Sequence, residues 1–164
     1  MSEPLLSVAD LTIAFRGAAR PAVDGASFSL DRGRTLGVVG ESGSGKSTVA
    51  LALLRLLPPA ARIRSGTIRF DGGDIHTASE RTLATIRGRR MAMIFQEPTA
   101  ALDPVMTVGD QVAEPSVIHE RRSWKEARQQ ARRLLERVGI PAERSEEHTS
   151  ELQSRGLISY AVFC

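Results

Sequence analysis

The chain has 164 residues, of which 41% are hydrophobic and 25% charged, and it carries a net charge of +3. This length and composition are typical of a soluble globular domain, and no apolar run approaches the roughly 20 residues of a membrane span. The single cysteine is the last residue, Cys164, so we expect neither an internal disulfide nor a cysteine-based metal site. The N-terminus has no signal-peptide pattern, which predicts a cytoplasmic protein.

The N-terminal segment has the loosely alternating pattern of β-structure. Residues 5–15 predict either a strand pair or one long strand. Residues 22–30 predict a further strand, which leads into a turn at residues 31–33. We therefore expect an antiparallel β-region at the start of the chain.

The segment at residues 40–48 fits G-x-x-x-x-G-K-[ST], the phosphate-binding loop of nucleotide triphosphatases. Its members are Gly40, Glu41, Ser42, Gly43, Ser44, Gly45, Lys46, Ser47 and Thr48. The glycines allow backbone N–H groups to converge on an anion, and a helix beginning near Gly45 would add positive partial charge. We expect Lys46 to contact the β- and γ-phosphates and the Ser47 hydroxyl to bind Mg²⁺.

The sequence on both sides of this loop supports phosphate binding. Residues 36–39 are a short apolar run, which predicts a buried parallel strand. Residues 49–57 predict a largely apolar helix that ends at Pro58 and Pro59. The alternative is a Gly/Ser-rich turn without a ligand, but the order of strand, loop and helix is the one that the motif requires.

Further elements are predicted downstream of this helix. An alternating strand at residues 67–70 leads into a turn, and residues 79–86 predict a short helix whose first residue is a suitable N-cap serine. The apolar residues 91–95 predict a second core strand. Residues 107–118 predict a helix that is interrupted at Pro115.

Residues 123–138 give the strongest helical signal. Ser123 and Glu126 stand in capping-box register, and Gly139 marks the end of the helix. Apolar residues recur at helical spacing and are expected to form the buried face, with Trp124 in core packing rather than at a ligand. These residues are Trp124, Ala127, Ala131, Leu134, Leu135 and Val138.

The basic residues are mostly arginines, and the sequence pI is about 9.7. They gather at residues 87–90 and along residues 121–137, where they alternate with apolar or acidic residues. We interpret these arginines as a solvated helix face and as positive charge near the phosphate-binding site. We expect no nucleic-acid partner.

Three segments follow one another in a recognisable order: residues 23–28, the loop at 37–48, and residues 94–109. Together they resemble the N-terminal half of an ATP-binding-cassette (ABC) ATPase, and most closely the ATPase subunits of dipeptide and oligopeptide importers. The third segment best distinguishes this family from other P-loop proteins, because the loop alone would also suit a kinase or a GTPase. The resemblance covers about residues 1–143. It implies an α/β fold, which consists of a P-loop NTPase core, an N-terminal antiparallel β-subdomain and the start of a helical subdomain. The fold is expected to be truncated within that helical subdomain.

The resemblance also implies roles for matching residues. Phe15 stands where the family has an aromatic that stacks on adenine, with strand-end core packing as the alternative. Gln96 lies 50 residues after Lys46 and matches a glutamine that binds Mg²⁺ and senses the γ-phosphate; the alternative is a surface glutamine at a strand end. Lys46 and Gln96 would be the catalytic residues, Ser47 and Gln96 the metal ligands, and residues 40–48 with Phe15 the ATP site.

The resemblance stops at residue 143. The family would continue to a signature motif, a Walker B strand with its Asp and Glu, and a switch histidine, and we find none of these in the remaining residues. Residues 144–154 instead read as the in-frame translation of a common short-read sequencing adapter. We expect residues 144–164 to be a non-native, disordered tail in which His148 has no catalytic role; a natural acidic tail is the alternative.

The implied function is ATP hydrolysis coupled to uptake of peptides or a similar small solute, with ATP and Mg²⁺ as cofactors. The implied partners are a second ABC ATPase subunit, identical or paralogous, and transmembrane permease subunits that contact residues 97–118. The implied location is the cytoplasmic face of a bacterial-type inner membrane. Other P-loop enzymes and soluble ABC ATPases of DNA repair or translation are alternatives, as is a truncated nucleotide-binding fragment. We expect the 164-residue chain to be inactive in hydrolysis, and the sequence does not identify the solute.

Overall fold

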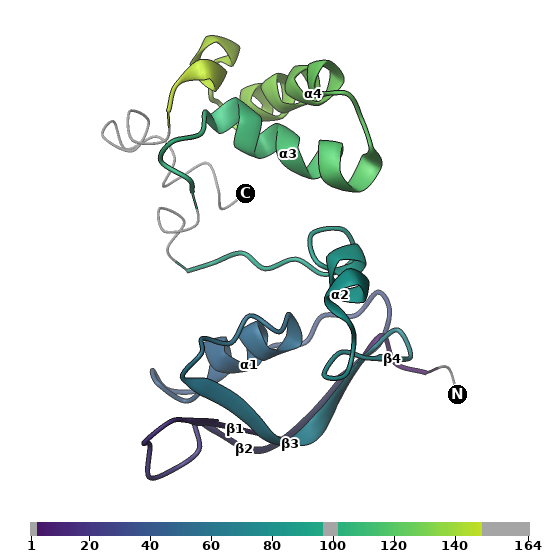
Figure 1. Ribbon diagram of the computed structural model, residues 1–164, viewed down its shortest axis with the longest axis vertical. Coiled ribbons are helices and arrows are strands. Elements are labelled where there is room, and N and C mark those ends of the chain that lie inside the picture. The colour runs from purple at the N-terminus through teal and green to yellow at the C-terminus, as the bar shows by residue number, and fades with distance from the viewer. Residues whose placement is uncertain (1–2, 97–101, 149–164) are drawn as a thin grey trace. The chain divides into compact units, whose positions relative to one another are not determined.

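The computed structural model describes residues 3–96 and 102–148 (Figure 1). It divides into two compact units, residues 1–87 and 88–164. Within the described residues, no helix is both long and apolar enough to cross a membrane.

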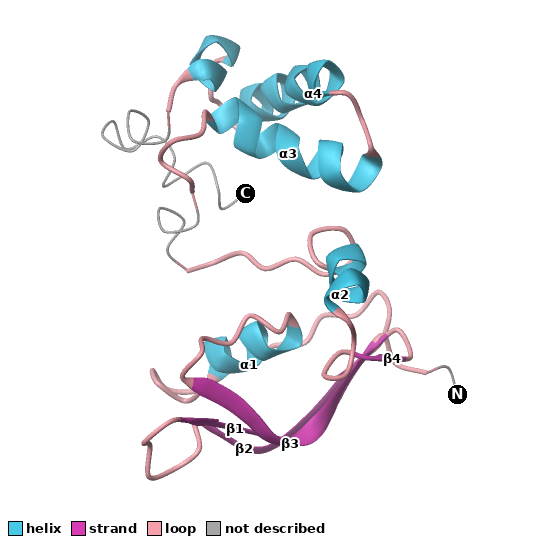
Figure 2. Ribbon diagram, in the orientation of Figure 1, coloured by secondary structure: helices cyan, strands magenta, loops and turns pink. Residues whose placement is uncertain are grey.

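The first unit is built on a four-stranded antiparallel sheet with the strand order β2-β1-β3-β4 (Figure 2). Its strands are β1 (Leu6–Phe15), β2 (Val23–Leu30), β3 (Ala61–Phe70) and β4 (Gly73–Asp74). The predicted antiparallel β-region is therefore confirmed, and residues 5–15 contain one long strand rather than two. The strand predicted at residues 67–70 is the second half of the longer β3.

The central strand β1 carries the most deeply buried side chains of the sheet. Leu11 and Ile13 are completely buried. A bulge lies just before them, where Asp10 has a φ of 48° and the register with both neighbouring strands shifts. The Ser27 hydroxyl accepts a hydrogen bond from the Asp10 N–H at 2.8 Å and donates one to the Asp10 carboxylate at 3.2 Å. This pair replaces ladder hydrogen bonds that the bulge removes.

Two helices complete the first unit. α1 (Lys46–Leu53) begins directly after Gly45, as predicted. It ends earlier than the expected residue 57, because Arg55 adopts a left-handed φ of 52° that a helix cannot continue through. α2 (Glu80–Ile86) confirms the second predicted helix: the Ser79 hydroxyl accepts a hydrogen bond from the N–H of Thr82 at 3.1 Å.

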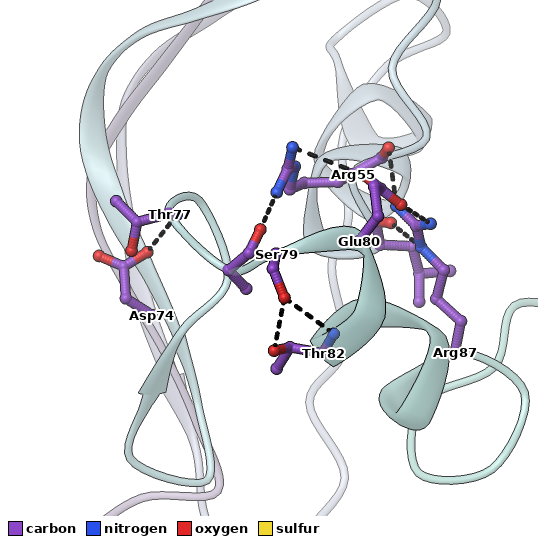
Figure 3. Close-up of polar contacts among 9 residues, drawn as sticks. Arg55, Asp74, Thr77, Ser79, Glu80, Thr82 and Arg87 are labelled. Carbon is purple, nitrogen blue, oxygen red and sulfur yellow. Dashed lines mark hydrogen bonds and ion pairs between the residues drawn. The ribbon is translucent and has the colours of Figure 1, made fainter.

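Arg87, the residue that ends α2, binds the carboxyl end of α1 (Figure 3). Its Nε donates to the Leu54 carbonyl at 2.7 Å, and its Nη2 donates to the Arg55 carbonyl at 3.2 Å. Its Nη1 also donates to the Glu80 carboxylate at 3.0 Å. A helix leaves its last carbonyls without intrahelical partners, so this one guanidinium satisfies two groups that would otherwise need water.

Two predicted core strands are wrong. Residues 36–39 form no strand, and residues 91–95 form none beyond a single bridge at Met91; Val39 and Ile94 are 94% and 74% exposed. A buried parallel strand needs hydrogen-bonded neighbours on its edges and covering layers on its faces. The part of the chain that the structure describes contains one sheet, and it is entirely antiparallel. Apolar sequence alone therefore does not form a strand at these positions.

The second unit is a helical hairpin. It consists of α3 (Val108–Glu120), α4 (Trp124–Arg137) and the 3-10 helix η2 (Ala142–Glu146). Val108 near the start of α3 packs with Leu135 near the end of α4. Ala113 in the middle of α3 packs with Ala127 and Ala131. The two helices are therefore antiparallel, and the alanines allow a close approach.

The caps of the second unit confirm the sequence reading of α4. Ser123 and Glu126 form the predicted capping box, and Gly139 follows the helix with a φ of 82°. Arg128 of α4 holds Asp110 of α3 with two parallel hydrogen bonds of 2.6 and 3.1 Å. Hydrogen bonding from Arg128 lowers the pKa of the Asp110 carboxyl below its usual value.

Two details of these helices differ from the predictions. α3 continues through Pro115 without interruption. The N-cap at Thr107 and the packing of the buried Ala113 stabilise the helix before Pro115, and the proline removes only one backbone donor. Trp124 is 42% exposed, and Leu134 and Val138 are 38% and 41% exposed. Trp124 is the first residue of α4, and its ring contacts the guanidinium of Arg128 at 5.5 Å from the centroid.

Residues 144–148 pack against the start of α3. The N–H of Val108 donates to the Glu147 carbonyl at 3.1 Å, and Thr107 forms an isolated bridge with His148. Ser145 is 2% exposed, and its hydroxyl has no hydrogen-bond partner among the described residues. Residues 149–164, the rest of the expected tail, lie outside the described residues.

The buried hydroxyl of Ser145 gives a testable difference between two serines. Ser145→Ala should raise the free energy of unfolding of the second unit by about 1 kcal/mol, because it removes a buried polar group without a partner. Ser123→Ala should lower it by about 1 kcal/mol, because it removes the helix cap. Fluorescence of Trp124, the single tryptophan, follows urea unfolding of this unit. A loss of stability in Ser145→Ala would contradict the assignment of this hydroxyl as unpaired.

Candidate phosphate-binding loop

The loop at residues 40–48 turns sharply before it enters α1. The N–H of Ser44 donates to the Glu41 carbonyl at 3.2 Å, which closes a turn. Gly43 and Gly45 both have left-handed φ values, 82° and 88°. Left-handed residues that alternate with ordinary ones turn successive N–H groups toward one side of the chain, which is the geometry of an anion-binding nest.

Gly45 is the point of closest approach between the loop and the sheet. A Cβ at Gly45 would lie 2.3 Å from the Ala22 carbonyl oxygen and 3.0 Å from a methyl group of Val23. The position therefore excludes a side chain for two independent reasons, the backbone conformation and the space. It fixes the amino end of α1 against the start of β2.

The Lys46 ammonium folds back over the loop. It donates to the Gly40 carbonyl at 2.8 Å, to the Glu41 carbonyl at 2.7 Å and to the Ser44 hydroxyl at 3.2 Å. These three oxygens come from the first half of the motif, whereas Lys46 begins α1. The cation is thus held beside the nest by the same loop that forms it.

The remaining loop residues leave the amino end of α1 open to an anion. Gly40, Glu41, Ser42 and Ser47 are exposed, and Thr48 is half-buried in the first turn. No acidic residue occupies the first turn of α1, so nothing on the helix opposes the positive partial charge of its amino end.

Phe15 lies at the same end of the sheet as the loop. It is the last residue of β1, half-buried, and it pairs with Ala61 of β3. Ile13, two positions earlier on β1, pairs with Val23, which is the residue beneath Gly45. This register is compatible with an aromatic face near a nucleotide held by the loop, and the adenine-stacking role stays a prediction.

Gln96 belongs to the second unit and is exposed. It is the last described residue before the gap at 97–101, so part of the segment expected to contact a permease lies outside the described residues. The structure brings residues 40–48 together at one end of the sheet with Phe15. The roles of Gln96 with Mg²⁺ and the γ-phosphate stay predictions.

The donor set at the loop suits Mg²⁺ bound together with phosphate. Mg²⁺ takes oxygen ligands and usually reaches proteins through few side chains plus substrate phosphates and water. The exposed Ser47 hydroxyl is an oxygen ligand of this kind at the amino end of α1. Within the described ranges, no group of three or more His, Cys, Asp or Glu residues could form a metal site of its own.

Sequence reasoning did not identify Ala22 and Val23 as part of the site. Their backbone and side chain form the surface on which Gly45 rests. Their signal is not local: Ala22 and Gly45 meet only because Ala22 donates to the Ile13 carbonyl at 2.8 Å at the edge of the sheet. No spacing rule in a single sequence contains that contact.

Comparison with known proteins identifies a family for most of the chain. The family described as "ABC transporter" matches residues 23–157. Among curated relatives, the peptidoglycan transport ATP-binding protein YejF of Agrobacterium fabrum is 47% identical over 92% of this chain. The oligopeptide transport ATP-binding protein OppD of Bacillus subtilis is 44% identical over 84% of it, and the dipeptide transport ATP-binding protein DppD of the same organism 39% over 99%. The chain spans 29%, 39% and 51% of these relatives.

Solved structures give the same fold. A dimeric post-hydrolysis state of the ATP-binding cassette MJ0796 bound to ADP and Pi matches with a TM-score of 0.78 and 20% identity. The match covers 96% of this chain and 67% of that one. A second dimeric structure of MJ0796, a bacterial ABC transporter cassette, matches with a TM-score of 0.77. The expected α/β cassette fold is therefore confirmed.

The contact at Gly45 predicts different effects for two loop glycines. Gly43→Ala should destabilise the first unit by about 1 kcal/mol, because it adds only a left-handed alanine with open space around it. Gly45→Ala should cost more than about 2 kcal/mol, since the Ala22 carbonyl must also move. Hydrogen exchange of the β1 amides measures both changes. Equal effects of the two substitutions would show that the contact with Ala22 does not constrain the loop.

Proposed function

This chain belongs to the ABC transporter family, and we propose that it carries the ATP-binding part of an importer that couples ATP hydrolysis to uptake of peptides or a similar small solute. The observation that carries the proposal is the loop itself, in which Lys46 lies beside a nest of backbone N–H groups. The names of the relatives support the solute class, because they describe peptidoglycan, oligopeptide and dipeptide transport.

The loop residues would bind the phosphates of ATP. The N–H groups around Gly43 and Gly45 would hold phosphate oxygens, and the Lys46 ammonium would exchange its loop oxygens for those of the β- and γ-phosphates. Ser47 would hold Mg²⁺, which supplies charge neutralisation to the phosphates when bound. The backbone N–H donors are fixed by the fold before ATP arrives, so only the Lys46 ammonium must rearrange.

Phe15 and Gln96 would complete the site. Phe15, half-buried at the end of β1, would present its ring to adenine, an interaction that tolerates any flat aromatic side chain. Gln96 would place its amide near the Mg²⁺ and the γ-phosphate. The segment that follows Gln96 would relay a γ-phosphate-dependent shift to the membrane subunits.

The proposed partners are a second ATPase subunit and transmembrane permease subunits. Cassettes of the similar MJ0796 are dimeric, which supports pairing of two such domains, identical or paralogous. Closure of the pair on ATP would drive the permeases between their two states. The whole protein would then act at the cytoplasmic face of an inner membrane. The solute would be set by permease and binding subunits.

The proposal includes a foreign origin for the residues after 143. Residues 144–154 match the translation of a sequencing adapter, and the buried Ser145 hydroxyl lacks a partner within the described part of the chain. A native continuation would supply a signature motif and the Walker B carboxylates. The family match itself extends to residue 157, so the junction needs a direct test.

Sequencing unfragmented genomic DNA across codon 143 provides that test. We expect the reading frame to continue into a signature motif, a Walker B strand and a switch histidine. If the genomic frame encodes residues 144–164 of this sequence, the adapter interpretation is wrong. The packing of residues 144–148 on α3 is then a property of the natural protein.

We predict that the 164-residue chain binds ATP with Mg²⁺ but does not hydrolyse it above background, because the Walker B carboxylates are missing from its sequence. Lys46→Ala should weaken binding of a fluorescent ATP analogue by about tenfold or more, the effect of one charge-assisted contact. Titration of the analogue and release of inorganic phosphate measure the two properties.

The matched control is Lys125→Ala, which removes the second of the two lysines from an exposed position on α4. It should leave ATP binding unchanged. Binding that is insensitive to Lys46→Ala would overturn the role of the loop. Magnesium-dependent turnover that Lys46→Ala abolishes would overturn the predicted inactivity.

A further inference from the structure

A second concave site lies in the first unit, apart from the phosphate-binding loop. It has a volume of about 320 Å³. Its lining residues are Arg55, Leu57, Ala61, Arg62, Ile63 and His76. None of them belongs to residues 40–48. They come from the segment after α1, from the start of β3, which follows it directly, and from the turn after β4.

The polar lining of this pocket is basic. Arg62 and His76 are exposed, and within the described residues no hydrogen bond or ion pair occupies either side chain. The acidic residues nearest to His76 along the chain are Asp74 and Glu80. The Asp74 carboxylate accepts hydrogen bonds from the backbone N–H of His76 at 2.7 Å and from that of Thr77 at 3.1 Å (Figure 3).

Arg55 is held in place by a backbone carbonyl and by an ion pair with Glu80. Its Nη1 donates to the Ala78 carbonyl (Figure 3). Its left-handed backbone is fixed by its own N–H, which donates to the Ala52 carbonyl at 3.0 Å, and by Arg87, which binds its carbonyl. The Glu80 carboxylate is 3.6 Å from Arg55 and closer, at 3.0 Å, to Arg87. A guanidinium has five N–H donors and these contacts use only some of them, so Arg55 keeps donor capacity toward the pocket.

The remaining lining is apolar. Leu57 and Ile63 are half-buried and Ala61 is buried. An inorganic anion would make no apolar contact with these side chains. A ligand with a small hydrocarbon part would cover them and remove apolar surface from water. Two guanidinium groups and an imidazole suit a doubly charged head, because a guanidinium fork matches phosphate oxygens in pairs.

We propose that this pocket binds a phosphate monoester with a small apolar substituent, its phosphate held by Arg55, Arg62 and His76 and its substituent placed over Leu57 and Ile63. The site is independent of the loop at 40–48. The pocket lies next to the end of α1 through Arg55, whose carbonyl Arg87 binds.

Phenyl phosphate is the probe. Titrated into the ¹⁵N-labelled 164-residue chain, it should shift the amide signals of residues 61–63 and 76. Shifts at residues 43–47 report phosphate at the loop instead, and they should disappear in Lys46→Ala. Arg62→Gln should weaken its binding by about tenfold or more, since it removes a charged donor from an exposed position without disturbing the core. Inorganic phosphate should bind more weakly than phenyl phosphate, because it lacks the apolar part.

Two variants separate this site from charge effects and from the nucleotide site. Arg64→Gln removes the same charge from the same strand outside the pocket and should have no effect. Lys46→Ala should leave the phenyl phosphate shifts at residues 61–63 and 76 intact while it weakens ATP binding, so failure of either site is distinguishable from failure of the other. Equal effects of Arg62→Gln and Arg64→Gln, or shifts confined to residues 43–47, would overturn the proposal. His76→Gln is a second pocket variant that should also weaken binding.

Discussion

The contact between Gly45 and the Ala22 carbonyl fixes the amino end of α1 against the sheet. Everything at the candidate site follows from that position. The left-handed φ of Gly45 turns the preceding N–H groups inward, and it starts α1 so that Lys46 reaches back to the carbonyls of Gly40 and Glu41. The sheet needs no catalytic side chain to do this. The sheet supplies a rigid surface, and the contact of Gly45 with that surface constrains the conformation of the loop.

Features that depend on neighbouring residues were predicted well from the sequence. The caps at Ser79 and Ser123 form as expected, because a serine hydroxyl meets an N–H three residues later within the same turn. The start of α1 and the end of α4 follow from the conformational freedom of Gly45 and Gly139. The conformation of the loop at residues 40–48 likewise depends mainly on its own glycines and on Lys46, so it could be predicted from the motif alone.

Features that depend on distant partners were not predictable in this way. Residues 36–39 have the composition of a buried strand, yet Val39 is 94% exposed, because a parallel strand requires neighbours that the described residues do not contain. Trp124 was assigned to the core by its spacing, but the first residue of a helix extends beyond the packed stripe.

The guanidinium of Arg87 also has a consequence for dissecting the protein into pieces. The helix that follows the phosphate-binding loop ends at Leu53, but the group that satisfies the Leu54 and Arg55 carbonyls lies 33 and 32 positions further on. A peptide that contained the loop and its helix but stopped before residue 87 would leave both carbonyls to solvent, and the helix would fray from that end. A piece designed to carry the loop should therefore extend at least to Arg87, where the first compact unit ends.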